Sequence, residues 1–153
     1  MTANPSNSLK WVLAIDDEPE TLDVVKHCLE VDGVEVLTAS GAKEGLDLYE
    51  KHLQQIGLVL LDYLMPHMTG DLVFECLQRV NPDVRVILLT GCDDNVAKRM
   101  FEEGLRGYIQ KPFFVEDLLQ RVREAQVVQV RGAFVCDREL ELRAIDATFS
   151  PEK

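Results

Sequence analysis

Five polar residues stand at or just beyond the ends of short apolar runs, where buried strands would end. They are Asp16, Asp17, Asp62, Thr90 and Lys111. Three carboxylates brought together repel one another unless a cation binds or a pKa rises. Carboxylate oxygens with room for water favour Mg²⁺. A carboxylate, a divalent cation, a lysine and a hydroxyl together suit a phosphoryl group, because the carboxylate attacks phosphorus while the others neutralise its oxygens.

The elements that must position these residues alternate between strand-like and helix-like patterns. The expected strands cover residues 11–15, 34–38, 58–61, 84–89 and 108–109. Apolar residues at helical spacing follow each strand, and Ser40 is expected to cap the second helix. Such alternation predicts a parallel α/β sheet with helices on both faces. Its functional crevice lies beyond the carboxyl ends of the strands, which would bring the polar residues to one edge.

Four motifs have the order and spacing of one known family. They are Asp16-Asp17-Glu18, Asp62 with Met65-Pro66 and Gly70, Thr90-Gly91, and Tyr108-x-x-Lys111-Pro112-Phe113. As a set they resemble the receiver domain of two-component response regulators, over about residues 9–127. The resemblance implies a flavodoxin-like, doubly wound sheet of five strands in the order 2-1-3-4-5. It also implies a signalling domain that catalyses only its own phosphorylation and dephosphorylation, not an enzyme with a separate substrate.

The resemblance implies a role for each acidic residue. Asp62 would accept a phosphoryl group from a histidine on a histidine kinase or a histidine phosphotransfer protein, forming 4-aspartylphosphate. Mg²⁺ would be ligated directly by Asp17, by Asp62 and by the backbone carbonyl of Leu64. Asp16 would act on the metal mainly through a bound water.

The remaining matched residues would respond to the phosphoryl group. Lys111 would contact the phosphoryl oxygens, and the Lys111–Pro112 bond would be cis, an isomer that proteins use almost only before proline. Thr90 would swing toward the phosphoryl group and Tyr108 would follow it inward. Leu64 and Cys92, two places after Asp62 and Thr90, would border the path of the hydrolytic water.

Simpler interpretations exist for single residues. Asp16, Asp17 and Glu18 are also what a helix N-terminus favours, although capping requires neither Asp62 nor Lys111. Glu18 itself is interpreted as a helix-start residue. A phosphatase of the haloacid-dehalogenase type would need D-x-D where this chain has Asp-Tyr-Leu. A dinucleotide-binding domain would need G-x-G-x-x-G after the first strand, and a flavodoxin would lack the acidic residues.

Composition excludes several other classes of protein. The 153 residues carry a net charge of −11, and the pI near 4.6 opposes direct nucleic-acid binding. No apolar run is long enough to span a membrane, and the first ten residues do not form a signal peptide. The four cysteines form no C-x-x-C pair, which favours reduced thiols in a cytoplasmic protein.

The chain is expected to have three parts. Residues 1–9 form a flexible arm, 10–127 the receiver domain, and 128–153 an extension or linker. Two interpretations follow. One is a stand-alone receiver that signals to a downstream protein effector through its fourth helix, fifth strand and fifth helix. The other is the receiver portion of a larger regulator or hybrid sensor kinase, with a fused output domain outside this chain.

Overall fold

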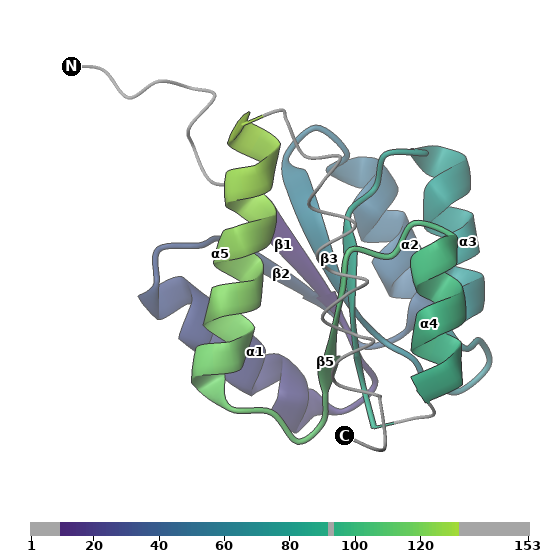
Figure 1. The fold of residues 1–153 in the computed structure, drawn as a ribbon, viewed down its shortest axis with the longest axis horizontal. Coiled ribbons are helices and arrows are strands. Elements are labelled where there is room, and N and C mark those ends of the chain that lie inside the picture. The colour runs from purple at the N-terminus through teal and green to yellow at the C-terminus, as the bar shows by residue number, and fades with distance from the viewer. Residues whose placement is uncertain (1–9, 92–93, 132–153) are drawn as a thin grey trace.

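A computed structural model describes residues 10–91 and 94–131, in which strands and helices alternate (Figure 1). The strands are β1 (Trp11–Ile15), β2 (Val36–Ala39), β3 (Ile56–Asp62), β4 (Val86–Thr90) and β5 (Gly107–Gln110). The helices are α1 (Pro19–Val31), α2 (Ala42–Lys51), α3 (Gly70–Val80), α4 (Asp94–Glu102) and α5 (Val115–Arg131). None of these described helices combines the length and apolar character that a membrane span requires. α5 continues through the expected domain limit at residue 127.

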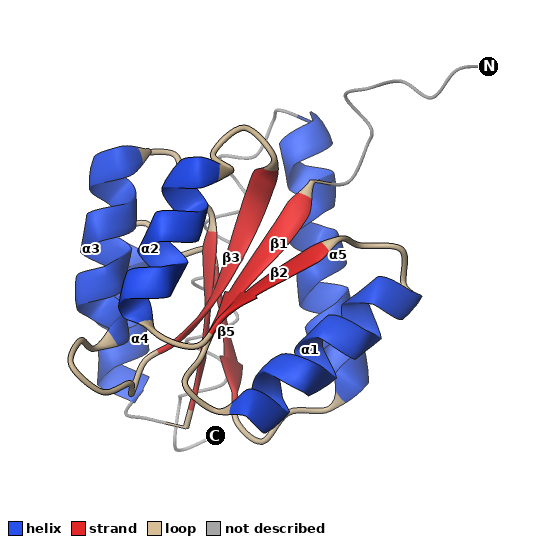
Figure 2. Cartoon of the chain, turned by 180° about the vertical axis from the view of Figure 1, so that it is seen from behind, coloured by secondary structure: helices blue, strands red, loops and turns tan. Residues whose placement is uncertain are grey.

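The strands form one parallel sheet in the order β2-β1-β3-β4-β5, which confirms the predicted fold class. α1 and α5 cover one face of this sheet, and α2, α3 and α4 cover the other (Figures 1 and 2). Successive strand side chains point to opposite faces. In β1, Leu13 and Ile15 join the apolar cluster under α2–α4, whereas Val12 and Ala14 join the cluster under α1 and α5. Burial on both faces explains why the strand sequences are apolar without alternation.

Two strands begin later than the sequence predicted, because turns use the residues before them. The amide of Val34 donates to the carbonyl of Leu29 at 2.9 Å and so closes the end of α1. Gly33, with φ +90°, allows that reversal. The amide of Val84 donates to the carbonyl of Asn81 at 3.0 Å. Both valines are buried and look like strand residues, yet β2 begins at Val36 and β4 at Val86.

The predicted cap at Ser40 is wrong. Gly41 is the N-cap residue of α2 and provides no side-chain cap. The backbone N–H and the hydroxyl of Ser40 instead both donate to Oε1 of Glu44, at 2.9 and 3.0 Å. A carboxylate in the first turn therefore reaches back and holds the chain that enters α2, as in one half of a capping box.

Gly70 fixes how α3 leaves the strand that carries Asp62. A Cβ atom at Gly70 would lie 2.7 Å from the carbonyl oxygen of Asp62 and 2.8 Å from Cα of Tyr63, closer than real contacts allow. The amide of Gly70 donates to the carbonyl of Tyr63 at 2.7 Å. The loop between β3 and α3 is therefore closed tightly against the end of β3.

Gly70→Ala is expected to lower the free energy of unfolding by about 1–3 kcal/mol, because backbone atoms must move to admit the methyl group. Gly91→Ala is the matched control, since among the described residues its Cβ would meet the carbonyl oxygen of Lys111 alone, at an ordinary 3.6 Å. Urea unfolding followed by circular dichroism measures both. Equal stability of the two variants would show that the contact at Gly70 relaxes without cost.

Candidate functional site

The carboxyl ends of β1 and β3 bring three aspartates together. Ile15 and Leu61 are paired in these adjacent strands, so the residues that follow them are also neighbours. One carboxylate oxygen each from Asp16, Asp17 and Asp62 lies within 4.8 Å of the others. Asp16 and Asp62 are buried, whereas Asp17 is half-buried. The structure thus gathers the acidic residues that the sequence placed at one edge of the sheet.

Lys111 follows β5 and places its ammonium group among carboxylates. Its Nζ atom lies 2.7 Å from Oδ2 of Asp16 and 3.4 Å from Oδ1 of Asp62. A further carboxylate, that of Glu18, has Oε1 at 3.4 Å from the same nitrogen. The Lys111–Pro112 peptide bond is cis, as the resemblance implied. One ammonium group therefore contacts three acidic side chains.

Burial and mutual repulsion set the electrostatics of this cluster. The pKa of Asp62 is raised to about 7, first by burial and then by the negative charge of Asp16, while Lys111 acts in the opposite direction. Burial lowers the pKa of Lys111, but its hydrogen bond to Asp16 and the surrounding negative charges outweigh that effect and raise it overall. Lys111 therefore stays charged, and it offsets only part of the carboxylate repulsion.

The cluster fits a small divalent cation with oxygen ligands. Three carboxylates lie together, and the pKa of Asp62 is raised by burial first and then by the negative charge of Asp16, which Lys111 only partly offsets. Asp17 is half-buried, so the cluster is open to water on its side. Carboxylates and water are the ligands that Mg²⁺ prefers. The side chain of Leu64 is exposed, and a metal contact from its backbone carbonyl stays a prediction.

The two predicted switch residues are both buried, in the strands β4 and β5. Thr90 is the last residue of β4, and its carbonyl accepts a hydrogen bond from the amide of Lys111 at 3.0 Å. Tyr108 lies in β5 and belongs to the apolar cluster under α2–α4. Cys92, predicted to border the water path, lies outside the described residues. Thr90 is thus joined to Lys111 through the backbone, while the switch roles of Thr90 and Tyr108 stay predictions.

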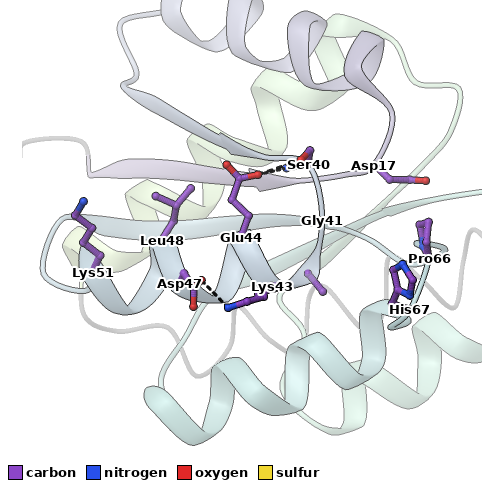
Figure 3. A pocket seen from close by; sticks show the side chains of 11 residues that line it. Asp17, Ser40, Gly41, Lys43, Glu44, Asp47, Leu48, Lys51, Pro66 and His67 are labelled. Carbon is purple, nitrogen blue, oxygen red and sulfur yellow. Dashed lines mark hydrogen bonds and ion pairs between the residues drawn. The ribbon is translucent and has the colours of Figure 1, made fainter.

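A groove beside the cluster was not expected from the sequence. It has a volume of about 890 Å³, and Figure 3 shows its lining along α2. Asp17, Pro66 and His67 lie at one end and Lys51 at the other. His67 has φ +74°, which shapes the loop after β3. Because Asp17 belongs to both, the groove adjoins the acidic cluster.

Comparison with known proteins identifies relatives of this fold and site. The family model described as response regulator receiver domain matches residues 12–123. A probable transcriptional regulator, ycf27 of Cyanophora paradoxa, is 34% identical over 116 residues, which are 74% of this chain and 47% of that protein. The chain thus spans about half the length of the curated relatives it matches.

Solved structures resemble the chain over nearly their whole length. A CheY-like response regulator receiver domain protein from Methanospirillum hungatei JF-1 is 32% identical, with a TM-score of 0.76, covering 82% of this chain and all of that one. The CheX-CheY complex from Borrelia burgdorferi, which includes BeF3 and Mg²⁺, gives 26% identity and a TM-score of 0.73. That match covers 79% of this chain and 92% of the other.

Asp62→Asn is expected to stabilise the metal-free protein at neutral pH, by roughly 1–4 kcal/mol. The pKa of Asp62 lies at about 7 in the folded protein, above its ordinary 3.8. Its protonated form therefore contributes stability that is complete below about pH 4 and lost as the pH rises to about 7. Asparagine cannot ionise, so the variant avoids this loss.

Urea unfolding in EDTA from pH 4 to pH 8 measures this difference. The advantage of Asp62→Asn over wild type should grow across that range. Asp23→Asn, an exposed change on α1, is the control and should show no such growth. A constant difference between wild type and Asp62→Asn would contradict the raised pKa.

Proposed function

The chain belongs to the response regulator receiver domain family, and we propose that it is a phosphorylation-dependent signalling switch with Asp62 as its phosphoacceptor. The donor is a phosphohistidine on a histidine kinase or a histidine phosphotransfer protein. The observation that carries this proposal is the place of Asp62, at the end of β3, in the same cluster as Asp16 and 3.4 Å from the ammonium nitrogen of Lys111.

Transfer forms a bond between a carboxylate oxygen of Asp62 and the phosphorus atom. The phosphorus–nitrogen bond of phosphohistidine breaks, and the imidazole nitrogen keeps the electron pair. Asp62 must be ionised to attack, and the charge of Lys111 favours the ionised form. The same ammonium group would neutralise a phosphoryl oxygen. The chain thus catalyses only its own phosphorylation and dephosphorylation.

The acidic cluster would hold Mg²⁺ through Asp17, Asp62 and the backbone carbonyl of Leu64, with Asp16 acting through water. When bound, Mg²⁺ supplies positive charge that offsets the oxygens of the transferred group. Two observations support this assignment. The carboxylate oxygens lie within 4.8 Å of one another, and the Borrelia burgdorferi relative forms a complex with BeF3 and Mg²⁺.

Thr90 and Tyr108 would carry the change at Asp62 to the face made by α4, β5 and α5. Thr90 ends the strand before α4, and Tyr108 is buried in β5. An ion pair also joins α4 to α3, because Nη2 of Arg99 on α4 lies 3.4 Å from Oδ2 of Asp71 on α3. That face would bind a downstream protein effector or a fused output domain.

An alternative is that the chain is the receiver portion of a longer regulator or hybrid sensor kinase. The observation that favours it is the length of the curated relatives, of which this chain matches about half. Several of those relatives are named transcriptional regulators. Because the whole chain carries a net charge of −11, residues 10–127 would act as the receiver, and any nucleic-acid contact would belong to another domain. The length of the native reading frame distinguishes the two interpretations.

With Mg²⁺ and acetyl phosphate, the protein is expected to gain one phosphoryl group on Asp62. The modification should be stable in acid and labile in base, as an acyl phosphate is. Asp62→Asn should lose it, because an amide is a poor nucleophile, and EDTA should stop the transfer. Intact-protein mass spectrometry with peptide mapping measures the product. Phosphoryl label retained on serine or histidine in Asp62→Asn would overturn the proposal.

The phosphoryl group on Asp62 is expected to hydrolyse slowly. Leu64 offers no hydrogen bond to orient water, and its exposed side chain stands in the loop directly after Asp62. Leu64→Asn with Cys92→Glu should speed the loss several-fold, since each orienting contact is worth on the order of 1 kcal/mol. Decay of labelled protein at equal Mg²⁺ measures it. Equal decay of wild type and the double variant would show that these side chains do not set the lifetime.

A further inference from the structure

Glu18 does more than begin a helix. It is the N-cap residue of α1, as its interpretation as a helix-start residue implies, but its side chain makes no capping hydrogen bond. Pro19 follows at the first helical position and needs no partner for its nitrogen. The carboxylate of Glu18 is therefore available for other contacts.

Glu18 contacts both members of the Asp16–Lys111 ion pair. The backbone N–H of Glu18 donates to Oδ1 of Asp16 at 2.9 Å. The carboxylate of Glu18 lies 3.4 Å from Nζ of Lys111. The same carboxylate oxygen accepts a hydrogen bond from the hydroxyl of Thr21 at 3.1 Å, which orients it from the first turn of α1. Glu18 is thus held by the helix and directed at Lys111.

Glu18 differs from the other two partners of Lys111 in one respect. Asp16 and Asp62 both belong to the group of carboxylates placed to hold a cation, and among the described residues Glu18 does not. A divalent ion held by that group would draw their oxygens away from Lys111 and repel its ammonium. Glu18 would then be the carboxylate that keeps Lys111 in place.

Building on the proposed function, we propose that Glu18 is a positioning residue for Lys111. It keeps the ammonium group at the mouth of the aspartate cluster when Mg²⁺ is held there, ready to contact a phosphoryl oxygen. The side chain of Glu18 is 60% exposed, so its ion pair is weak and its effect on rate is modest.

The test compares Glu18→Gln with Glu20→Gln, which removes the same charge from an exposed site in the same turn of α1. Lysine labelled with ¹³C reports on Lys111 through its Hε–Cε cross-peak, assigned by its absence in Lys111→Arg. Without Mg²⁺, Asp16 should keep this peak displaced from those of exposed lysines in all variants. With Mg²⁺, the peak should stay displaced in wild type and Glu20→Gln, and should move to the exposed-lysine position in Glu18→Gln.

Phosphorylation by acetyl phosphate at saturating Mg²⁺ should be about two- to five-fold slower in Glu18→Gln and unchanged in Glu20→Gln. Thr21→Val should give a smaller effect in the same direction, because its hydroxyl only orients Glu18. Adding it to Glu18→Gln should then cause no further loss. A Lys111 peak that Glu18→Gln leaves displaced with Mg²⁺, or a faster rate in that variant, would overturn the proposal.

The same experiments distinguish an error in the proposed function from an error in the role of Glu18. If wild type gains no phosphoryl group on Asp62, the proposed function is wrong, whatever the Lys111 peak shows. If wild type is phosphorylated but Glu18→Gln matches it in both rate and spectrum, only the role of Glu18 is wrong.

Discussion

The close approach of buried carboxylates is the constraint on which the rest of the site depends. Parallel strands end at the same edge, and the pairing of β1 with β3 places Asp16 beside Asp62. Their repulsion must be offset within the protein, and Lys111 supplies the nearest positive charge. That lysine follows directly on β5, whose carboxyl end lies at the same edge of the parallel sheet. Three strand ends are thus tied together by one ion-pair network.

The burial that stabilises the sheet also tunes the site. Every residue of β4 and the last five of β3 are buried, because helices cover both faces. Apolar burial of this kind is the main favourable term in folding. The same burial is the largest cause of the raised pKa of Asp62, since a charge is poorly solvated at the end of such a strand. Burial therefore stabilises the fold and, by raising the pKa of Asp62, also disfavours the ionised carboxylate that must attack phosphorus.

The fold could be predicted from the sequence because the apolar runs, and the polar residues that end them, are local signals. Asp62 and Lys111 could be assigned to one edge because both follow strands of a sheet predicted to be parallel. The starts of β2 and β4 were misplaced, since Val34 and Val84 are apolar and buried but give their amides to turns. The contact of Glu18 with Lys111 was missed because it spans 93 residues. No local pattern shows whether a carboxylate at a helix start caps the helix or reaches a distant lysine.

Two separate series of contacts connect Asp62 with α4. A structural change at Asp62 could reach α4 through either of them. One runs along the sheet, where Asp62 is paired with Leu89 and Thr90 follows at the strand end before α4. The other runs through the loop closed by Gly70 into α3, where Asp71 meets Arg99 of α4. The first path is buried and packed, so it resists small displacements. The second ends in a partly exposed ion pair that exchanges partners at little cost. A packed path and a partly exposed one thus meet at the same helix, whose Ala97, Met100 and Phe101 are buried in the apolar cluster under α2–α4, so any displacement of α4 must be accommodated by that core.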